Sequence, residues 1–504
     1  MLKNRLYSLG VRVRLTQKRQ SDYWKRERIN YSIRQFRNCL ERVPAYRKFL
    51  LEHKIDPADI RTYKNFEDLV PPMNKDEYLR KFSLEDLCED GTLSRQSLVL
   101  TSTSGSTGNP FYFPRNGILD YQSSLYHEMF LRWAEIDSKK STLVIVGFGM
   151  GVWIGGVITY EAFKTISERG HNLSIITPGV NKKEIFEAMR NLAPHYDQII
   201  LCGYPPFMKD VVDEGVSEGI NWKKHDIRLI CAAEAFSEKF RDHIMSRLGI
   251  KNPYRHVMNI YGSADLGTMA TETPVSILVR RLALRKPKLY KAIFREANRL
   301  PTLAQFHPHF VNFEAKNGRI FVTGENIIPL VRYEIGDNGG VLDYADVEAA
   351  CTAAGLDLPH EIRRAGIANT VMELPFVYIY ERTDLSTKLY GAIIYPEHVK
   401  AGLESHPLLA RHITGKFTMF TKHDKKHNEY LEINIEMKPN VRETRELGKM
   451  VVEAVVKGLV EKSAEYAYLT GALHERIHPR VVFWPHGHPN HFQVGIKQKW
   501  VKVK

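Results

Sequence analysis

The sequence predicts an α/β protein: a large N-terminal domain with parallel-sheet βα layers and a β-rich subdomain, joined by a hinge to a small C-terminal α+β domain. A chain of 504 residues is too long for one small core and favours two or three domains. Between residues 143 and 261, short apolar runs alternate with helical patterns, which is typical of βαβ units and a parallel sheet. The pattern turns to strands from residue 310 and to a mixed α+β pattern beyond residue 382. We therefore divide the chain into residues 1–382 and 383–504.

The N-terminal part is predicted to be helical before the alternating pattern begins. Residues 20–53 place apolar side chains near helical spacing among Lys and Arg, and Pro44 divides this stretch into two helices. A helix is also predicted over residues 118–136, after a turn at Asn116-Gly117.

The alternating region defines the predicted parallel sheet. Strands are predicted at 143–146, 174–177, 198–202, 227–232 and 256–261, and helices at 156–169, 182–192, 207–214 and 237–248. Ligands of such sheets bind beyond the carboxyl ends of the strands. The apolar stretch 143–160 is long enough for a membrane span, but it contains five glycines. A buried strand, a glycine turn and a helix start explain that order better, so we expect no membrane span.

The second half of the chain is predicted to be richer in strands. Residues 278–300 are strongly basic and predict a helix with a solvated face. Strands are predicted at 310–314, 319–323 and 329–334, with a hairpin turn at Asn317-Gly318. The predicted small domain has strands at 390–395, 415–422, 428–436 and 480–484, and helices at 397–404 and 441–461.

Charge and cysteine content limit the classes of function. The formal net charge of +14 favours polyanionic partners such as nucleotides. No nucleic-acid-binding motif accompanies the charge, so we expect no nucleic acid partner. The five cysteines are widely spaced and form no Cys-x-x-Cys pattern. This spacing indicates a reducing compartment, which we take to be the cytoplasm, and argues against a cysteine-based zinc site.

A Ser/Gly-rich segment at residues 101–110 follows a strand predicted at 98–100, and eight of its ten residues are Ser, Thr or Gly. Glycine lets the backbone approach a ligand closely, and hydroxyl groups add donors to the backbone amides. Such a segment suits phosphate oxygens, although the composition also occurs in flexible linkers. No Gly-Lys-Ser or Gly-Lys-Thr follows, which excludes a Walker loop. The candidate phosphate-binding residues are Ser104, Gly105, Ser106, Thr107 and Gly108.

Six short motifs follow one another in a characteristic order. They are residues 103–110, Ala-Ala-Glu at 232–234, Asn-Ile-Tyr-Gly-Ser-Ala-Asp at 259–265, Val-Arg-Tyr-Glu-Ile-Gly-Asp at 331–337, Glu-Arg-Thr-Asp at 381–384 with Gly391 and Tyr395-Pro396, and Gly-Ile-Lys at 495–497. In this order they resemble the adenylate-forming superfamily of acyl-CoA synthetases and adenylation domains, and most closely its phenylacetate–CoA ligase branch. The resemblance covers nearly the whole chain.

The resemblance implies ATP-dependent activation of a carboxylic acid to an acyl-adenylate, followed by thioester formation with CoA. It implies ATP, Mg²⁺ and CoA as cofactors. Beside the phosphate loop, the nucleotide-binding residues would be Glu234, Asn259, Tyr261, Gly262, Asp337 and Arg382. Asp265 would hold the metal, Lys497 would be the catalytic lysine, and Asp384 would be the hinge.

The chemistry of the residues agrees with these roles. Two anions must meet, so catalysis depends on positioning and charge neutralisation. Asp337 can accept hydrogen bonds from both ribose hydroxyls, Tyr261 offers a flat face for adenine, and Lys497 can act as a point charge. Simpler interpretations remain: Asp337 is also a common turn acid, and Arg382 could form only a surface ion pair.

The C-terminal lysine has its own alternatives. Lys497 lies in a basic end that could be merely solvated, and Lys499 is two residues further on. Lys499 is therefore the alternative candidate for the catalytic lysine.

Departures from the superfamily motif keep other functions open. Asp265 is one methylene shorter than the usual Glu, Ala264 replaces a hydroxyl residue, and Asn259 replaces an acid. One alternative passes the acyl group to a carrier-protein thiol or an amine, and another is a non-catalytic nucleotide-binding or scaffold relative. Segments 125–131, 146–153 and 203–207 are the predicted acyl-pocket walls, and their composition suggests an aromatic or medium apolar acid.

Overall fold

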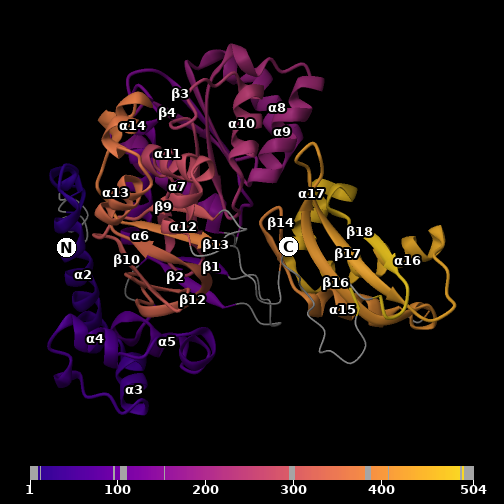
Figure 1. Ribbon diagram of the computed structural model, residues 1–504, viewed down its shortest axis with the longest axis horizontal. Coiled ribbons are helices and arrows are strands. Elements are labelled where there is room, and N and C mark those ends of the chain that lie inside the picture. Colours follow the sequence, from indigo (N-terminus) through magenta and orange to yellow (C-terminus); the bar gives the residue numbers. More distant parts are fainter. Residues whose placement is uncertain are drawn as a thin grey trace.

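The computed structural model describes residues 9–11, 13–94, 97–102, 111–151, 154–294, 301–380, 387–406, 408–488 and 491–492. Figure 1 shows a large body, coloured from indigo to orange, and a smaller orange-to-yellow body beside it. The N-terminal helices lie along the left side and at the lower end of the large body. They are α2 (Ser21–Arg42), α3 (Pro44–Glu52), α4 (Tyr63–Leu69) and α5 (Leu84–Leu87).

The two predicted N-terminal helices are confirmed as α2 and α3. Pro44 is the first residue of α3, a position where its missing N–H costs no helical hydrogen bond. Trp24 and Phe36 of α2 are buried in the main hydrophobic core. Arg28 of the same helix donates to Asn312 Oδ1 at 2.9 Å and to Asp343 Oδ1 at 2.7 Å, which ties α2 to the β-rich part of the chain.

Within the described part of the chain, an 11-stranded sheet runs in the order β10-β11-β12-β13-β9-β8-β7-β6-β5-β3-β4. The strands from β4 to β7 pair in parallel, which confirms the predicted parallel layer, and the others pair antiparallel. The parallel strands are β3 (Thr142–Gly147), β4 (Leu173–Ile176), β5 (Gln198–Gly203), β6 (Asp226–Ala232) and β7 (Val257–Ser263). The others are β8 (Gly267–Thr271), β9 (Thr302–Gln305), β10 (Val311–Lys316), β11 (Arg319–Gly324), β12 (Leu330–Leu342) and β13 (Phe376–Tyr380). A separate hairpin pairs β1 (Val99–Ser102) with β2 (Tyr112–Arg115).

The helices predicted between the parallel strands are also present. They are α7 (Ile154–Glu168), α8 (Lys182–Asn191), α9 (Pro205–Ser217) and α10 (Glu238–Leu248). Residues 143–160 thus form a buried strand and a helix start, and no described helix is long and apolar enough to cross a membrane. The predicted turn at Asn116 is wrong in detail, because its side chain caps α6 (Gly117–Trp133) by accepting from Ile118 N at 3.0 Å.

The basic segment 278–300 is less solvated than predicted. It begins in α11 (Pro274–Arg285) and continues in α12 (Pro287–Ile293). Arg280 is only 2% exposed, because the apolar face of α11 packs into a hydrophobic cluster and carries this side chain to two carboxylates. The lysines of α12 are exposed, so the predicted solvated face is confirmed for α12 only.

The antiparallel strands and two further helices complete the large body. The β10–β11 hairpin turns at Asn317-Gly318, as predicted, and both residues have positive φ, 54° and 81°. The helices α13 (Tyr344–Ala353) and α14 (Leu358–Arg364) were not predicted.

The small body contains a three-stranded sheet in the order β16-β17-β18 among the described residues. Its elements are α15 (Pro396–Ser405), β16 (Ile413–His423), β17 (Glu429–Met437), α16 (Arg445–Lys462), α17 (Ala464–Leu473) and β18 (Arg480–Trp484). The predicted strand 390–395 is confirmed only as the shorter β15 (Ala392–Ile394), which forms a hairpin with β14 (Thr387–Leu389). Its turn residues, Tyr390 and Gly391, both have positive φ. This hairpin lies between the two bodies in Figure 1.

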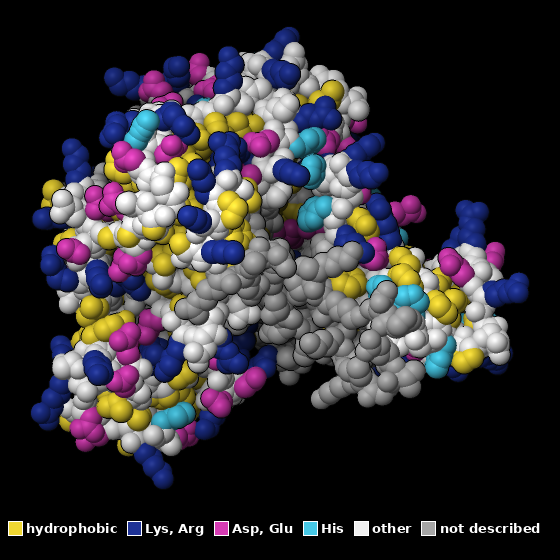
Figure 2. Space-filling view, viewed as in Figure 1, with side chains coloured by type: hydrophobic (Ala, Val, Ile, Leu, Met, Phe, Trp, Pro, Cys, Tyr) yellow, Lys and Arg dark blue, Asp and Glu magenta, His cyan; other side chains and the backbone are white. Residues whose placement is uncertain are grey.

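The surface charge is spread over the molecule. On the face shown in Figure 2, Lys and Arg side chains are scattered over both bodies and are mixed with Asp and Glu. No single basic stripe stands out on that face.

Candidate functional site

One cavity of about 310 Å³ lies at the carboxyl ends of β6 and β7 and faces the β14–β15 hairpin. This is the end of a parallel sheet where ligands bind in α/β proteins. All six described candidates for nucleotide and metal binding line it: Glu234, Asn259, Tyr261, Gly262, Asp265 and Asp337. The other predicted site residues, Ser104, Gly105, Ser106, Thr107, Gly108, Arg382, Asp384 and Lys497, lie outside the described residues.

The tyrosine and the acid assigned to adenosine binding lie side by side. The Tyr261 hydroxyl donates to Asp337 Oδ2 at 2.6 Å, although the two residues are 76 positions apart in the chain. The Tyr261 ring is tilted against Phe313, with 6.0 Å between ring centroids. The sheet therefore presents a carboxylate beside an aromatic ring in one cavity wall.

Asp265 is held by hydrogen bonds at the edge of the same cavity. Its side chain is 5% exposed, and its Oδ1 accepts from the Tyr333 hydroxyl at 3.0 Å. Asn326 Nδ2 donates to the Asp265 carbonyl at 3.1 Å. The described residues contain no group of three or more His, Cys, Asp or Glu that could hold a metal ion alone. A single carboxylate fits a Mg²⁺ ion that takes its other ligands from phosphate oxygens and water.

The segment after β6 contacts the β14–β15 hairpin through hydrogen bonds. Asn259 Nδ2 donates to the Glu234 carbonyl at 2.8 Å, and the Glu234 carboxylate accepts from the Gly391 amide. Lys388 Nζ donates to the Ala233 carbonyl at 2.7 Å. Ala233 has φ of +75°, an uncommon conformation for a residue with a Cβ, which turns the chain sharply at the strand end.

Gly262 has a structural reason to be glycine. A Cβ there would lie 2.7 Å from the Gly267 carbonyl oxygen, where β7 and β8 approach closely. The sequence alone assigned Gly262 to the nucleotide, and its place in the cavity wall is compatible with both roles.

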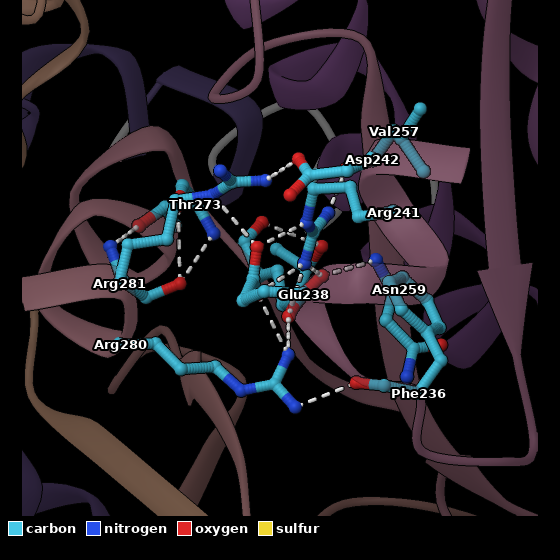
Figure 3. A network of polar contacts seen from close by, with 12 residues as sticks. Phe236, Glu238, Arg241, Asp242, Val257, Asn259, Thr273, Arg280 and Arg281 are labelled. Carbon is cyan, nitrogen blue, oxygen red and sulfur yellow. Dashed lines mark hydrogen bonds and ion pairs between the residues drawn. The ribbon is translucent and has the colours of Figure 1, made fainter. Parts of the chain in front are cut away.

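A buried ionic network joins α10, α11 and the ends of the neighbouring strands, and Figure 3 shows its contacts. Arg241, 0% exposed, donates to both Glu272 carboxylate oxygens at 2.9 Å and to Glu238 Oε2 at 3.0 Å. Arg280 donates to Glu238 Oε1 at 3.0 Å and to the Phe236 carbonyl at 2.6 Å.

The network reaches the cavity wall through the backbone of β7. Glu272 Oε2 accepts from the Asn259 amide at 2.9 Å. The ion pairs therefore hold the segment after β6, through the Phe236 carbonyl, and β7, through Asn259.

Several cavity residues were missed as candidates from the sequence. Among them are His127, Lys388 and Glu465. His127 lies within the predicted pocket wall 125–131, but α6 is buried on most of its surface, so its periodicity does not distinguish this residue. Glu465 lies on α17, which the sequence pattern did not predict. The other two predicted walls contribute Phe148 and Tyr204.

Glu465 carries a perturbed carboxyl group at the junction of the two bodies. Its Oε2 accepts from the Ile393 amide of the hairpin at 3.0 Å. Burial raises the pKa of Glu465 from 4.5 to about 7.

We expect Glu465→Gln to flatten the pH dependence of stability between about pH 4.5 and pH 7. The folded chain holds this proton more tightly than the unfolded chain, so the Glu465 contribution is fully present below pH 4.5 and is lost as pH rises through about 7. After discounting for partial exposure, the variant should be more stable than the parent above pH 7 by roughly 1 kcal/mol. Urea unfolding at pH 5 and pH 8 measures this difference. Glu461→Gln, at an exposed position on α16, is the control, and an equal response of both variants would contradict the assignment.

The fold is that of the adenylate-forming CoA ligases. The chain superposes on solved 2-hydroxyisobutyryl-CoA ligase in complex with 2-HIB-AMP and CoA in the thioesterification state, with a TM-score of 0.61 and 14% identity over 96% of this chain and 90% of that one. An open conformation of the same ligase gives a TM-score of 0.52 at 14% identity, over 95% and 91% of the two chains. Its postadenylation state with 2-HIB-AMP gives 0.51 at 13% identity, over 95% and 88%.

These likenesses confirm the predicted fold and its resemblance to adenylate-forming enzymes. No family model and no curated protein matches the sequence. The phenylacetate–CoA ligase branch stays a prediction.

Proposed function

We propose that this protein activates a carboxylic acid with ATP to an acyl-adenylate and then transfers the acyl group to the thiol of CoA. The observation that carries the proposal is the meeting of Tyr261, Asp265 and Asp337 in one cavity at the carboxyl ends of parallel strands. These residues come from two motifs that are separated in the sequence, and their donor types suit adenosine and a phosphate-bound cation.

The adenylation step requires attack of a carboxylate oxygen on the α-phosphate, with pyrophosphate as the leaving group. In the proposed site, Asp337 accepts from the ribose hydroxyls, and Asp265 would hold a Mg²⁺ ion. Mg²⁺ would supply charge neutralisation of the phosphate oxygens. Lys497 is proposed to bring a positive charge to the reacting oxygens, and residues 104–108 to bind the β- and γ-phosphates.

The thioester step is supported by the contacts of the hairpin. Lys388, Gly391 and Ile393 line the cavity, and the first two contact the segment after β6. In this arrangement the small body covers one side of the cavity. Among the three states of 2-hydroxyisobutyryl-CoA ligase compared above, the thioesterification state has the highest TM-score. We infer that the hairpin forms one wall of the path by which a thiol enters.

We expect Asp337→Ala to lose most of the thermal stabilisation that ATP with Mg²⁺ gives the parent protein. A ligand at a hundredfold excess over its Kd stabilises the folded state by about 2.7 kcal/mol, and the variant lacks the acceptor for the ribose hydroxyls. Differential scanning fluorimetry with and without ATP measures the shift. Asp59→Ala removes an exposed acid that does not line the cavity and is the matched control. Equal shifts for Asp337→Ala and the parent would refute the assignment, and acid-dependent ATP–pyrophosphate exchange over a panel of acids tests the activity itself.

A further inference from the structure

The cavity contains a buried histidine with an unsatisfied nitrogen. His127 lies on α6, is 1% exposed and lines the cavity. Its Nδ1 lies 2.8 Å from the Ser123 carbonyl oxygen, one turn back on the same helix. Because a carbonyl oxygen only accepts hydrogen bonds, Nδ1 must carry the hydrogen. The structure thereby determines which ring nitrogen is the donor.

The other ring nitrogen is an acceptor. Burial lowers the pKa of His127 to about 4, so the imidazole is neutral near pH 7 and Nε2 carries a lone pair. Nε2 is buried and has no hydrogen-bond partner within the described residues. Since Nδ1 is anchored to the helix, Nε2 lies on the far side of the ring from that anchor. A buried acceptor without a donor costs about 1–3 kcal/mol, which a ligand donor would recover.

Two threonines extend this polar region. Thr268 Oγ1 lies 2.8 Å from the hydroxyl of Ser123, the residue that anchors His127. The His127 ring meets the Phe163 ring edge-on at 5.3 Å, and Thr159 is one turn before Phe163 on α7. We call His127, Thr159 and Thr268 the polar floor; all three line the cavity.

The elements that carry the polar floor contribute no described charged side chain to the cavity lining. From α6, α7 and β8, the described lining residues other than the polar floor are Ile154, Gly155, Ile158 and Gly267. The lining cations Lys75, Arg80 and Lys388 come from other elements, and Lys388 is bonded to the Ala233 carbonyl. A charged group at the floor would find no counter-charge among the described lining residues of α6, α7 and β8, and burying a charge without a partner is costly.

We propose that the acid substrate carries a neutral hydrogen-bond donor, such as a hydroxyl group, at its end remote from the carboxylate, and that Nε2 of His127 accepts this hydrogen bond. The inference rests on the proposed function and specifies the substrate class of the same site. His127 is thus a specificity-determining residue, and the polar floor selects hydroxylated monocarboxylic acids over their unsubstituted parents. The selection arises because the parent acid leaves Nε2 unpaired.

The test uses acid pairs that differ by one hydroxyl: 4-hydroxyphenylacetate with phenylacetate, and 6-hydroxyhexanoate with hexanoate. We expect the parent protein to prefer the hydroxylated member of at least one pair by 10-fold or more in kcat/KM of ATP–pyrophosphate exchange. His127→Leu should remove most of this preference while retaining exchange with the unsubstituted acid. His256→Leu is the matched control, because burial also lowers the pKa of that histidine to about 4 and it does not line the cavity.

The outcomes separate the two proposals. If ATP binds and acids support exchange, but the parent prefers no hydroxylated acid or His127→Leu keeps the preference, the inference about His127 is wrong. If ATP binds and none of the hydroxylated acids supports exchange, the inference is likewise overturned. If neither ATP binding nor exchange occurs, the proposed function itself fails and the inference falls with it.

A spectroscopic measurement covers the case in which His127→Leu does not fold. In the full-length protein labelled with ¹⁵N-histidine, the His127 ring should give the shifts of a neutral imidazole protonated at Nδ1 down to about pH 5. Adding the preferred hydroxylated acid should move the Nε2 resonance, and the unsubstituted acid should not. A ring protonated at Nε2, or identical responses to both acids, would overturn the inference.

Discussion

Replacing Arg241 with Met is expected to destabilise the protein by about 3–5 kcal/mol, the cost of breaking a buried ion pair by removing one partner. The Arg241 side chain is fully buried and pairs with Glu238 and Glu272, both of which are also buried. Met fills the space but leaves these carboxylates with less positive charge nearby. The midpoint of urea unfolding, followed by tryptophan fluorescence, measures the loss.

Two further variants show whether the effect comes from this network. Arg280→Met should cost less than Arg241→Met, because Glu238 and Glu272 both keep their bonds to Arg241. Arg190→Met breaks an exposed ion pair with Glu187 and should leave the midpoint unchanged. A loss as small for Arg241→Met as for Arg190→Met would contradict the structural role of the network.

The second large effect is expected for Gly391→Ala in the hairpin between the two bodies. A Cβ at Gly391 would lie 2.7 Å from Cε1 of the Tyr204 ring, and φ at this position is +88°. The hairpin should then be unable to dock against the cavity as it does here. We expect thioester formation from synthetic acyl-adenylate and CoA to fall by at least tenfold, while ATP–pyrophosphate exchange is retained.

Controls separate the docking contact from simple backbone strain. Gly415 has nearly the same φ, +84°, but a Cβ there would meet no atom within 4 Å. Gly415→Ala should therefore pay the strain, about 1 kcal/mol, without affecting either half-reaction. Lys497→Ala is expected to do the reverse of Gly391→Ala, losing exchange and keeping the thioester step, and Lys499→Ala tests the neighbouring register. Equal loss of both half-reactions in Gly391→Ala would show that the hairpin contact is not specific to the thioester step.

Local patterns predicted most of the parallel layer. The strand at 143–146, the helix after it and the two-residue turn at Asn317-Gly318 are each determined by residues close together in the sequence. Such elements can be predicted from a local pattern. The prediction of secondary structure failed where one short sequence pattern is compatible with two local structures. Asn116-Gly117 is compatible with a turn or a helix cap, and the run at 390–395 hid a turn with positive φ.

The candidate site could be predicted only in part. The order of motifs was enough to nominate Tyr261, Asp265 and Asp337, and the structure brings them to one cavity. It was not enough to find Tyr333 as the donor to Asp265, because that contact joins residues 68 positions apart.

The order of residues was sufficient to predict the alternation of strands and helices, the hairpin turn in the β-rich part and the types of side chain available to the site. The burial of Arg280 and the unpartnered, buried Nε2 of His127 become visible only in the folded arrangement. Periodicity indicates which side of an element is apolar, whereas the free-energy cost of burying a charge or a ring nitrogen depends on its partners. For Arg280 those partners, Glu238 and Glu272, come from other elements of the fold.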